Sequence, residues 1–333
     1  MTKRHIEHLT ALLISVVCAT SVHAQALITV DTISDAGSIS GNCELREAVL
    51  AAESNTAVDG CAAGSASGPD KIVFAPALAG QTIALAGILN FSGGAVIIDA
   101  QTRPIMLQTS GGNDVMDIVS TDVTLRGLDV YATGSGNGVT LISGSIRADN
   151  STIQGRLGIN AFGSSSTVTL NNSTVASTDS NALSEIAIRS GVGNNLAINN
   201  STVVAMLGKG LDVSSSTGTS NVYSSIIVGP TPVSGSLTSS TGGTVQATST
   251  ANAGLAASLA NNGGPTRTFA LLSGAAIDSG DCTNAVYPHF DQRYYFNPAT
   301  NSRSVGSGCD VGAFEKDAQD LLADRVFADG FEL

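Results

Sequence analysis

The stretches "VTLNNSTVA" (168–176) and "LAINNSTVV" (196–204) share one order of residues. Each has an alternating apolar strand, two asparagines, Ser-Thr and a second apolar strand. Looser copies of this pattern are "VIIDAQ" (96–101), "VTLRGLDV" (123–130), "IRADNSTIQ" (146–154) and "VYSSIIV" (222–228). With one small corner residue as the marker of each copy, the later intervals are 24, 22, 28 and 24 residues, for the markers Gly127, Ser151, Ser173, Ser201 and Ser225. Taking Ala100 as the marker of the first copy adds a step of 27 residues.

A period of this length, with several short strands and no helix in each repeat, predicts a solenoid. Leucine-rich repeats share the period, but their Leu/Asn consensus is missing. A β-sandwich has turns at spacings of about 8–12 residues without such self-similarity. The sequence therefore predicts an all-β fold, a right-handed parallel β-helix, in which each coil supplies about three strands and coils stack about 4.8 Å apart.

The corner residues indicate how successive coils lie over one another. Asn150, Asn172 and Asn200 hold the same place in three coils, so a ladder of side-chain amides along the axis is expected. Ordinary turn residues are the alternative, because Asn and Ser are common in turns. The alternating strands predict a narrow aliphatic core with these inward residues: Val123, Leu125, Val168, Leu170, Leu196, Ile198 and Ile226.

A solenoid exposes its core and unpaired backbone groups at both ends, so both ends need covers. In "GNCELREAVLAAES" (41–54), apolar residues recur at helical spacing, at Leu45, Ala48, Val49 and Ala52. We expect this helix to cover the first coil. At the other end, "YPHFDQRYYF" (287–296) holds five of the 14 Phe and Tyr residues. We expect its aromatic rings to seal the last coil.

The first residues have the pattern of a secretory signal peptide. Lys3 and Arg4 precede the apolar run "ALLISVVCAT" (11–20), and small residues suited to cleavage end at Ala24 or Ala26. A lipid anchor on Cys18 is not favoured, because Val17 before it is not small. Without residues 1–24 the chain has 13 basic and 26 acidic residues, a charge near −13. This charge argues against nucleic acid or anionic lipid as partners.

Four cysteines remain after cleavage, and in an oxidising compartment an even number suggests disulfides. They fall in two distant pairs, which favours the bonds Cys43–Cys61 and Cys282–Cys309. Neither a Cys-x-x-Cys motif nor a nearby His pair supports a metal site.

"CELREAVLAA" (43–52) closely resembles the Cys-Ser-Leu-Arg-Glu-Ala signature of exported bacterial β-helix proteins called CSLREA-domain proteins, with Glu44 in place of Ser. Three later stretches resemble the terminal segment known as the choice-of-anchor Q domain: "NNGGPTRTFALLSGAAIDSGD" (261–281), "DQR" (291–293) and "CDVGAFE" (309–315). That family has Gly after Asp-Gln-Arg, where this chain has Tyr294. The resemblance implies a secreted or surface-displayed bacterial β-helix protein, and it implies no reaction.

These features divide the chain into the following expected parts: a signal peptide (1–24), an N-terminal cap (25–94), β-helix coils (95–230), an irregular coil or linker (231–260), a C-terminal cap (261–315) and an acidic tail (316–333).

An enzyme of the parallel β-helix type would need carboxylates brought together from adjacent coils, to bind Ca²⁺ or to act as acid and base. The acidic residues fall at scattered offsets, and Asp122 and Asp149 are the best available pair. The candidate sugar-binding residues are Tyr287, His289, Tyr294 and Tyr295.

The sequence favours a secreted or cell-surface protein without catalysis or cofactor, whose long face contacts extracellular glycans or matrix. An extracellular polysaccharide lyase or hydrolase is the second interpretation, and Ca²⁺ is implied only there. A structural module of a surface assembly is the third.

Overall fold

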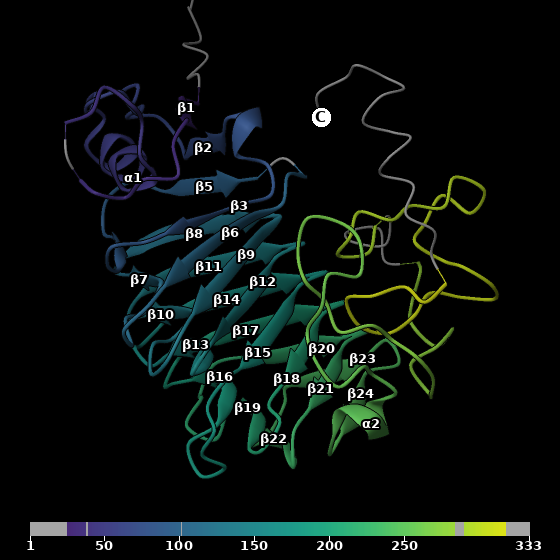
Figure 1. The fold of residues 1–333 in the computed structure, drawn as a ribbon. Coiled ribbons are helices and arrows are strands. Elements are labelled where there is room, and N and C mark those ends of the chain that lie inside the picture. The colour runs from purple at the N-terminus through teal and green to yellow at the C-terminus, as the bar shows by residue number, and fades with distance from the viewer. Residues whose placement is uncertain (1–24, 38, 101, 284–289, 318–333) are drawn as a thin grey trace, which may run out of the picture.

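The chain winds into a parallel β-helix of about eight turns, the fold expected from the repeat. The computed structural model describes residues 25–37, 39–100, 102–283 and 290–317. Figure 1 shows the strands stacked from α1 at the top to α2 at the bottom, with the C-terminal segment beside the stack. Expected residues outside these ranges are the signal peptide, Tyr287, His289 and most of the acidic tail.

Within the described residues, three parallel sheets of nine, eight and seven strands enclose the core. Sheet 1 contains β1 (Leu27–Val30), β2 (Asp70–Phe74), β5 (Val96–Asp99), β8 (Thr121–Arg126), β11 (Gly144–Asp149), β14 (Thr167–Asn171), β17 (Asn195–Asn199), β20 (Ser220–Tyr223) and β23 (Ser239–Thr241). Sheet 2 contains β3 (Gln81–Ala84), β6 (Ile105–Thr109), β9 (Leu128–Ala132), β12 (Thr152–Gly155), β15 (Thr174–Ser177), β18 (Thr202–Val204), β21 (Ile226–Val228) and β24 (Val245–Ala247). Sheet 3 contains β4 (Leu89–Phe91), β7 (Met116–Ile118), β10 (Val139–Leu141), β13 (Leu157–Ala161), β16 (Ile186–Ser190), β19 (Lys209–Asp212) and β22 (Thr231–Ser234).

The coils begin earlier and end later than the expected range of 95–230. The first coil with a strand in every sheet starts at β2, and the last strand of the solenoid is β24. The segment expected as an irregular coil or linker therefore contributes β22, β23 and β24, followed by the short helix α2 (Thr250–Ala253).

The corner between sheets 1 and 2 requires a left-handed backbone residue in successive coils. Asn150, Asn172 and Asn200 have φ of 51°, 46° and 46°, and Ser224 has 46°. Asn tolerates this conformation better than most other residues with a Cβ, and Gly adopts it freely. The Asn-Ser-Thr triplets therefore mark a sharp turn of fixed geometry.

The serines after these corner residues form a continuous hydrogen-bonded ladder. The backbone N–H groups of Ser151, Ser173 and Ser201 donate to the Oγ atoms of Ser173, Ser201 and Ser225, at 3.1, 3.1 and 3.0 Å. The Oγ of Ser173 in turn donates to the carbonyl of Asn171 at 2.8 Å. All four serines are fully buried. The ladder therefore satisfies backbone donors that the turn withdraws from the sheets.

The observed register changes the 24-residue interval that the sequence analysis measured from Gly127 to Ser151. Arg126 pairs with Asp149, so Gly127 lies opposite Asn150 and not opposite Ser151. Gly127 has φ of 64°, which fits this corner position. Leu128 takes the position of the ladder serine, and its N–H donates to the Oγ of Ser151 at 3.2 Å.

The asparagine side chains do not all serve the ladder that the sequence suggested. The amide of Asn150 donates to the carbonyl of Asp291 at 2.8 Å, and Asn172 accepts from Arg303 at 3.5 Å. The hydrogen bond between stacked asparagines occurs one residue earlier, where Asn199 donates to Asn171 at 3.0 Å. Two of the three corner asparagines thus contact the C-terminal segment.

The core is a column of aliphatic side chains, as expected. One stack on the inner face of sheet 1 is Ile98, Leu125, Ala148, Leu170, Ile198 and Val222, all with no exposed surface. Ile226 was expected in this core, but it points outward from sheet 2 into a second apolar cluster, and Ile227 takes the inward position.

The helix α1 (Leu45–Ser54) covers the first coil, as the sequence predicted. Leu45, Ala48, Val49 and Ala52 are buried against β1, β2, β4 and β5. Glu44 and Glu47 form a capping box at its N-terminus. Arg46 reaches away from the apolar face to the carbonyls of Gly87 and Ile88 and to Asp35.

The C-terminal cap lies along the flank of the solenoid. Leu255, Phe269, Leu271 and Val311 pack on outward residues of sheet 2, which are Ala176, Val204, Ile226, Val228 and Ala247. The aromatic stretch was expected to seal the last coil, but Tyr294 lies instead beside Gly127, at a corner of an early coil. The last coil is finished differently, because it places Ser240 and Gln246 opposite the inward residues Val222 and Ile227. Both residues are exposed. Polar residues at these inward positions give that end of the core a water-compatible surface.

Both expected disulfides are present. Cys43–Cys61 ties α1 to the loop that follows it, and Cys282–Cys309 closes a loop within the C-terminal cap. The bonds span 18 and 27 residues, a range in which the chain-entropy model gives about 3–4 kcal/mol each.

The serine ladder gives a direct test of the fold. Ser173→Ala removes the acceptor of the Ser151 N–H, so the free energy of unfolding should fall by about 1–3 kcal/mol. Urea unfolding followed by circular dichroism measures the loss. Ser239→Ala, at an exposed position of β23, is the matched control and should change little. Equal losses in the two variants would contradict the role of the ladder.

Candidate functional site

The structure does not bring Asp122 and Asp149 together. Asp122 on β8 pairs with Ser145 of β11, four residues before Asp149, so the two aspartates are offset by about 13 Å along the strands. The hydroxyl of Ser145 donates to Asp122 at 2.5 Å, and Asp149 lies 2.9 Å from Arg147. The expected catalytic pair is therefore not an acid–base pair, because both carboxylates belong to separate polar contacts.

The candidate tyrosines of the aromatic stretch are not an exposed platform. Tyr294 and Tyr295 are half-buried. The Tyr294 hydroxyl lies close to the corner at Gly127, and burial raises the pKa of this tyrosine, with Asp99 and Asp149 adding to the effect. The Tyr294 ring therefore closes the cap against the corner of sheets 1 and 2.

A groove of about 240 Å³ lies between sheet 2 and the loop at the start of the cap. One wall consists of the loop residues Asn261, Gly264, Pro265, Thr266 and Arg267. The opposite side and the floor are formed by Gly80, Gln81, Thr82, Pro104, Ile105, Met106 and Asp129, which lie on or beside β3, β6 and β9. The groove therefore joins parts of the chain that are far apart in sequence.

An ion pair links the two sides of the groove. Arg267 donates from Nε and Nη2 to the two carboxylate oxygens of Asp129, at 2.6 and 2.8 Å. The guanidinium carbon lies 5.3 Å from the centre of the Tyr131 ring, a distance suited to a cation–π contact. The hydrogen bonds to Asp129 raise the pKa of Arg267. The guanidinium is therefore fixed in charge and in position.

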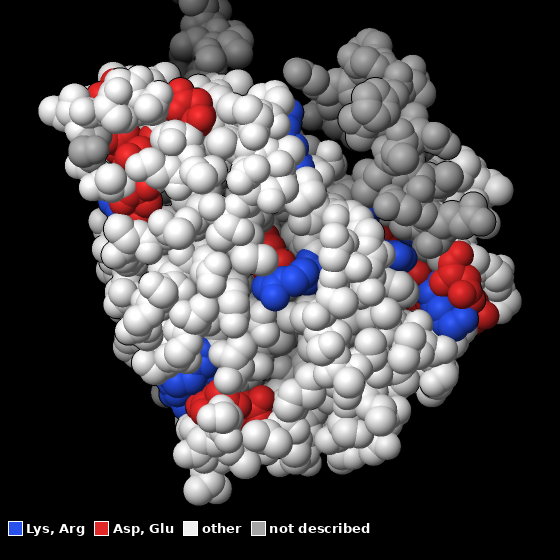
Figure 2. All heavy atoms as spheres, in the orientation of Figure 1, with Lys and Arg blue, Asp and Glu red and all other residues white. Residues whose placement is uncertain are grey.

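Charged groups are sparse around this region. Figure 2 shows one face of the molecule, largely uncharged, on which basic and acidic groups lie next to each other in small clusters. Such a surface has few localised charges.

The wall of the groove is held in place by a buried glutamine of the cap. Gln292 donates from Nε2 to the hydroxyls of Thr152 and Thr266, at 2.7 and 2.9 Å. Its Oε1 accepts from Thr174 at 2.6 Å. Gln292 has no exposed surface, and it connects β12 and β15 with the loop that carries Arg267.

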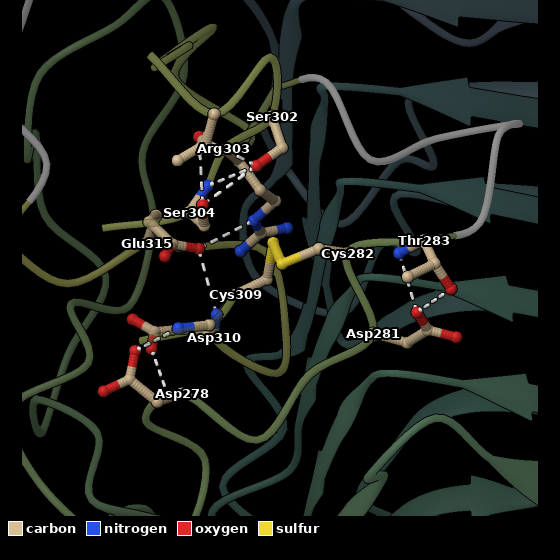
Figure 3. The surroundings of a disulfide bond; sticks show 12 residues. Asp278, Asp281, Cys282, Thr283, Ser302, Arg303, Ser304, Cys309, Asp310 and Glu315 are labelled. Atoms are coloured by element: carbon tan, nitrogen blue, oxygen red, sulfur yellow. Dashed lines mark hydrogen bonds and ion pairs between the residues drawn. A yellow bond between two sulfur atoms is a disulfide. The ribbon is translucent and has the colours of Figure 1, made fainter. Parts of the chain in front are cut away.

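A second network stabilises the cap behind this wall (Figure 3). Arg303 and Glu315 form an ion pair at 2.9 Å, and their side chains are 1% and 0% exposed. The Asp310 N–H donates to Glu315 at 3.0 Å, and the disulfide Cys282–Cys309 lies beside the pair. The ion pair and these hydrogen bonds fix the geometry of the cap around the disulfide.

An acidic pair lies at a separate place, where the chain passes from sheet 2 to sheet 3. Asp114 accepts from the Asn137 N–H at 2.7 Å, from the Asn137 amide at 3.2 Å and from the Thr140 hydroxyl at 2.5 Å. These three hydrogen bonds fix the position of the Asp114 carboxylate. The pKa of Asp117 rises from 3.8 to about 6, chiefly because burial removes water from its carboxyl group, and further because it faces and hydrogen-bonds Asp114.

No metal centre is evident in the part of the chain that the structure describes, since no three His, Cys, Asp or Glu side chains are grouped to hold an ion. In the same residues, no helix has the length and apolar character needed to cross a bilayer. Comparison with protein-family models, curated protein sequences and solved structures found no match to this chain.

Sequence reasoning missed the groove for a clear reason. Arg267 and Asp129 are 138 residues apart, and only the docking of the cap on sheet 2 brings them together. The pair Asp114 and Asp117 was also missed. Their spacing of three residues, across the end of a short turn, was the signal in the sequence that could have revealed the pair.

The Asp114–Asp117 pair predicts a pH-dependent stability. Asp117 binds its proton more tightly in the folded chain than in the unfolded chain, so its contribution to stability should fall as pH rises from about 4 to about 6 and then level off. Asp117→Asn should remove this slope and stabilise the protein by about 1–2 kcal/mol at neutral pH, after allowance for solvent screening. Urea unfolding at a series of pH values measures both effects. Asp122→Asn, at an exposed position of sheet 1, is the matched control. An unchanged slope of stability against pH in Asp117→Asn would contradict the assignment.

Proposed function

We propose that this chain is an exported β-helix protein that binds extracellular glycans in the groove between sheet 2 and the C-terminal cap, without transforming them. The groove itself is the observation that carries the proposal. It is smaller than the pockets of about 300–1,000 Å³ that enclose drug-sized ligands, so it suits one sugar unit of a longer chain.

The lining of the groove has the chemistry that sugars require. Gln81 and Thr82 are exposed on β3 and offer an amide and a hydroxyl, and Arg267 on the opposite wall offers guanidinium N–H groups. Met106, which is only partly buried, adds apolar surface for the C–H groups of a sugar ring. Polar groups at the rim with apolar contacts between them support binding of a hydroxyl-rich ligand.

Export is supported by the residue pattern of the first 24 residues and by the two disulfides, which persist in oxidising compartments. The resemblance of "CELREAVLAA" (43–52) and of the cap motifs to CSLREA-domain and choice-of-anchor Q proteins supports placement at a bacterial surface. The contacts of Arg46, Glu47 and Gln292 with the body of the protein give these motifs a structural role.

The carboxylate of Asp129, which lines the groove, is already engaged in an ion pair with Arg267, and this supports binding over catalysis. Asp129 is nearly buried, and both of its oxygens accept hydrogen bonds from Arg267. With both oxygens engaged by Arg267, this carboxylate is not placed to act as a general base on a ligand in the groove.

A polysaccharide hydrolase is the second candidate function, and the Asp114–Asp117 pair favours it. Asp117, whose pKa is raised to about 6, lies beside a second carboxyl group, that of Asp114, and acid–base cleavage of a glycosidic bond uses such a pair of carboxyl groups. The pair lies beyond the far end of β6 from the groove. In this function, release of reducing sugar should be greatest near pH 6 and should be lost in Asp117→Asn.

Blocking the groove tests the first proposal. Thr82→Trp fills the groove from an exposed strand position, so binding on a glycan array should fall at least about tenfold while the melting temperature stays nearly the same. The array is read with the purified mature protein, beside an assay for released reducing sugar and unsaturated uronate.

Ser239→Trp, on exposed β23, is the matched control and should bind glycans like the wild type. Absence of any bound glycan, or equal binding by Thr82→Trp, would overturn the groove as the binding site. Product release abolished in Asp117→Asn would instead establish the hydrolase.

A further inference from the structure

The two charged residues that line the groove differ in exposure. The side chain of Arg267 is 25% exposed, whereas that of Asp129 is 5% exposed. The positive member of the pair therefore faces the groove, and the negative member lies beneath it. The whole chain has a formal charge of −12, so a cation directed into a groove is unusual for this surface.

The hydrogen bonds of Arg267 leave one part of its guanidinium available. Nε and Nη2 donate to Asp129, and Nη1 makes no hydrogen bond to the residues that the structure describes. The ion pair and the Tyr131 ring hold the group in one orientation. A ligand would therefore meet a preorganised donor with little loss of side-chain entropy.

We propose that the groove selects acidic glycans, with the carboxylate of a uronic-acid unit accepting hydrogen bonds from Nη1 of Arg267. This inference rests on the proposed function and names its ligand class. Hydrogen bonds from a guanidinium to a carboxylate are about twice as strong as neutral ones, so this contact discriminates acidic from neutral sugars. The uncharged groups of Gln81 and Thr82 across the groove match the hydroxyls of the same unit.

A matched pair of oligosaccharides isolates the contribution of the carboxylate. A β-1,4-linked glucuronic-acid tetramer and cellotetraose have the same backbone and differ in a carboxylate against a hydroxymethyl group. The acidic tetramer should bind at least about tenfold more tightly in calorimetry. The difference should shrink at about 0.5 M NaCl, where charges are screened over a few ångströms. A glycan array with uronic-acid, sulfated and neutral chains distinguishes carboxylate from sulfate as the anion.

Two variants separate an anchoring role of Arg267 from a structural one. Asp129→Asn removes the buried negative charge and unmasks the guanidinium, so binding of the acidic tetramer should become about three- to tenfold tighter. The double variant Asp129→Asn/Arg267→Gln keeps an amide pair that can hydrogen-bond across the groove but carries no charge. It should bind both tetramers alike.

The pattern of results distinguishes this inference from the function on which it rests. Tighter binding by Asp129→Asn together with loss of preference in the double variant supports the anchor. Equal binding of the two tetramers by the wild type, a preference for sulfated over uronic-acid chains, or weaker binding by Asp129→Asn overturns the inference, while glycan binding itself stands. If neither tetramer nor any array glycan binds, both the inference and the proposed function fail.

Discussion

The turn between sheets 1 and 2 is the constraint on which the rest of the structure depends. At this corner the chain takes a left-handed residue, and the N–H of the next residue donates to a side chain and not to a strand carbonyl. The Oγ of a buried serine one coil further on accepts this hydrogen bond, and the same hydroxyl donates to its own coil, as Ser173 does. Each coil therefore fixes the height and register of its neighbour. Stacking of like residues, and the continuous aliphatic core, follow from this repeated bond.

The same regularity explains how the ends and the flank are treated. A stack of parallel strands leaves core and backbone open at both ends, and this chain closes them in two ways. At the start, α1 buries Leu45 and Val49 on the first coil, held by Arg46 and a disulfide. At the end, Ser240 and Gln246 replace aliphatic residues at inward positions. The aromatic and disulfide-linked segment is then free to dock along sheet 2, where it covers outward apolar residues and forms the groove.

The location of the groove follows from this docking. A bare solenoid face presents each coil at the same height and offers no concave site. The cap adds a second wall, and Gln292 fixes that wall to β12 and β15 through three hydrogen bonds. The bidentate contact between Arg267 and Asp129 then closes one side of the groove. The groove is thus rigid before any ligand arrives, which lowers the entropic cost of binding.

The sequence by itself determined the local and repeating features: the coil period, the helix over the first coil, both disulfides, and the inward positions of residues such as Leu125 and Ile198. Each of these depends on neighbours in sequence or on the translation of one coil to the next. The tertiary structure alone decided the outward position of Ile226, the one-residue shift at Gly127 and the meeting of Arg267 with Asp129. Coil lengths vary, so alignment between coils depends on which residues bond at the corner, and the path of the cap depends on an apolar surface that exists only after the coils have stacked.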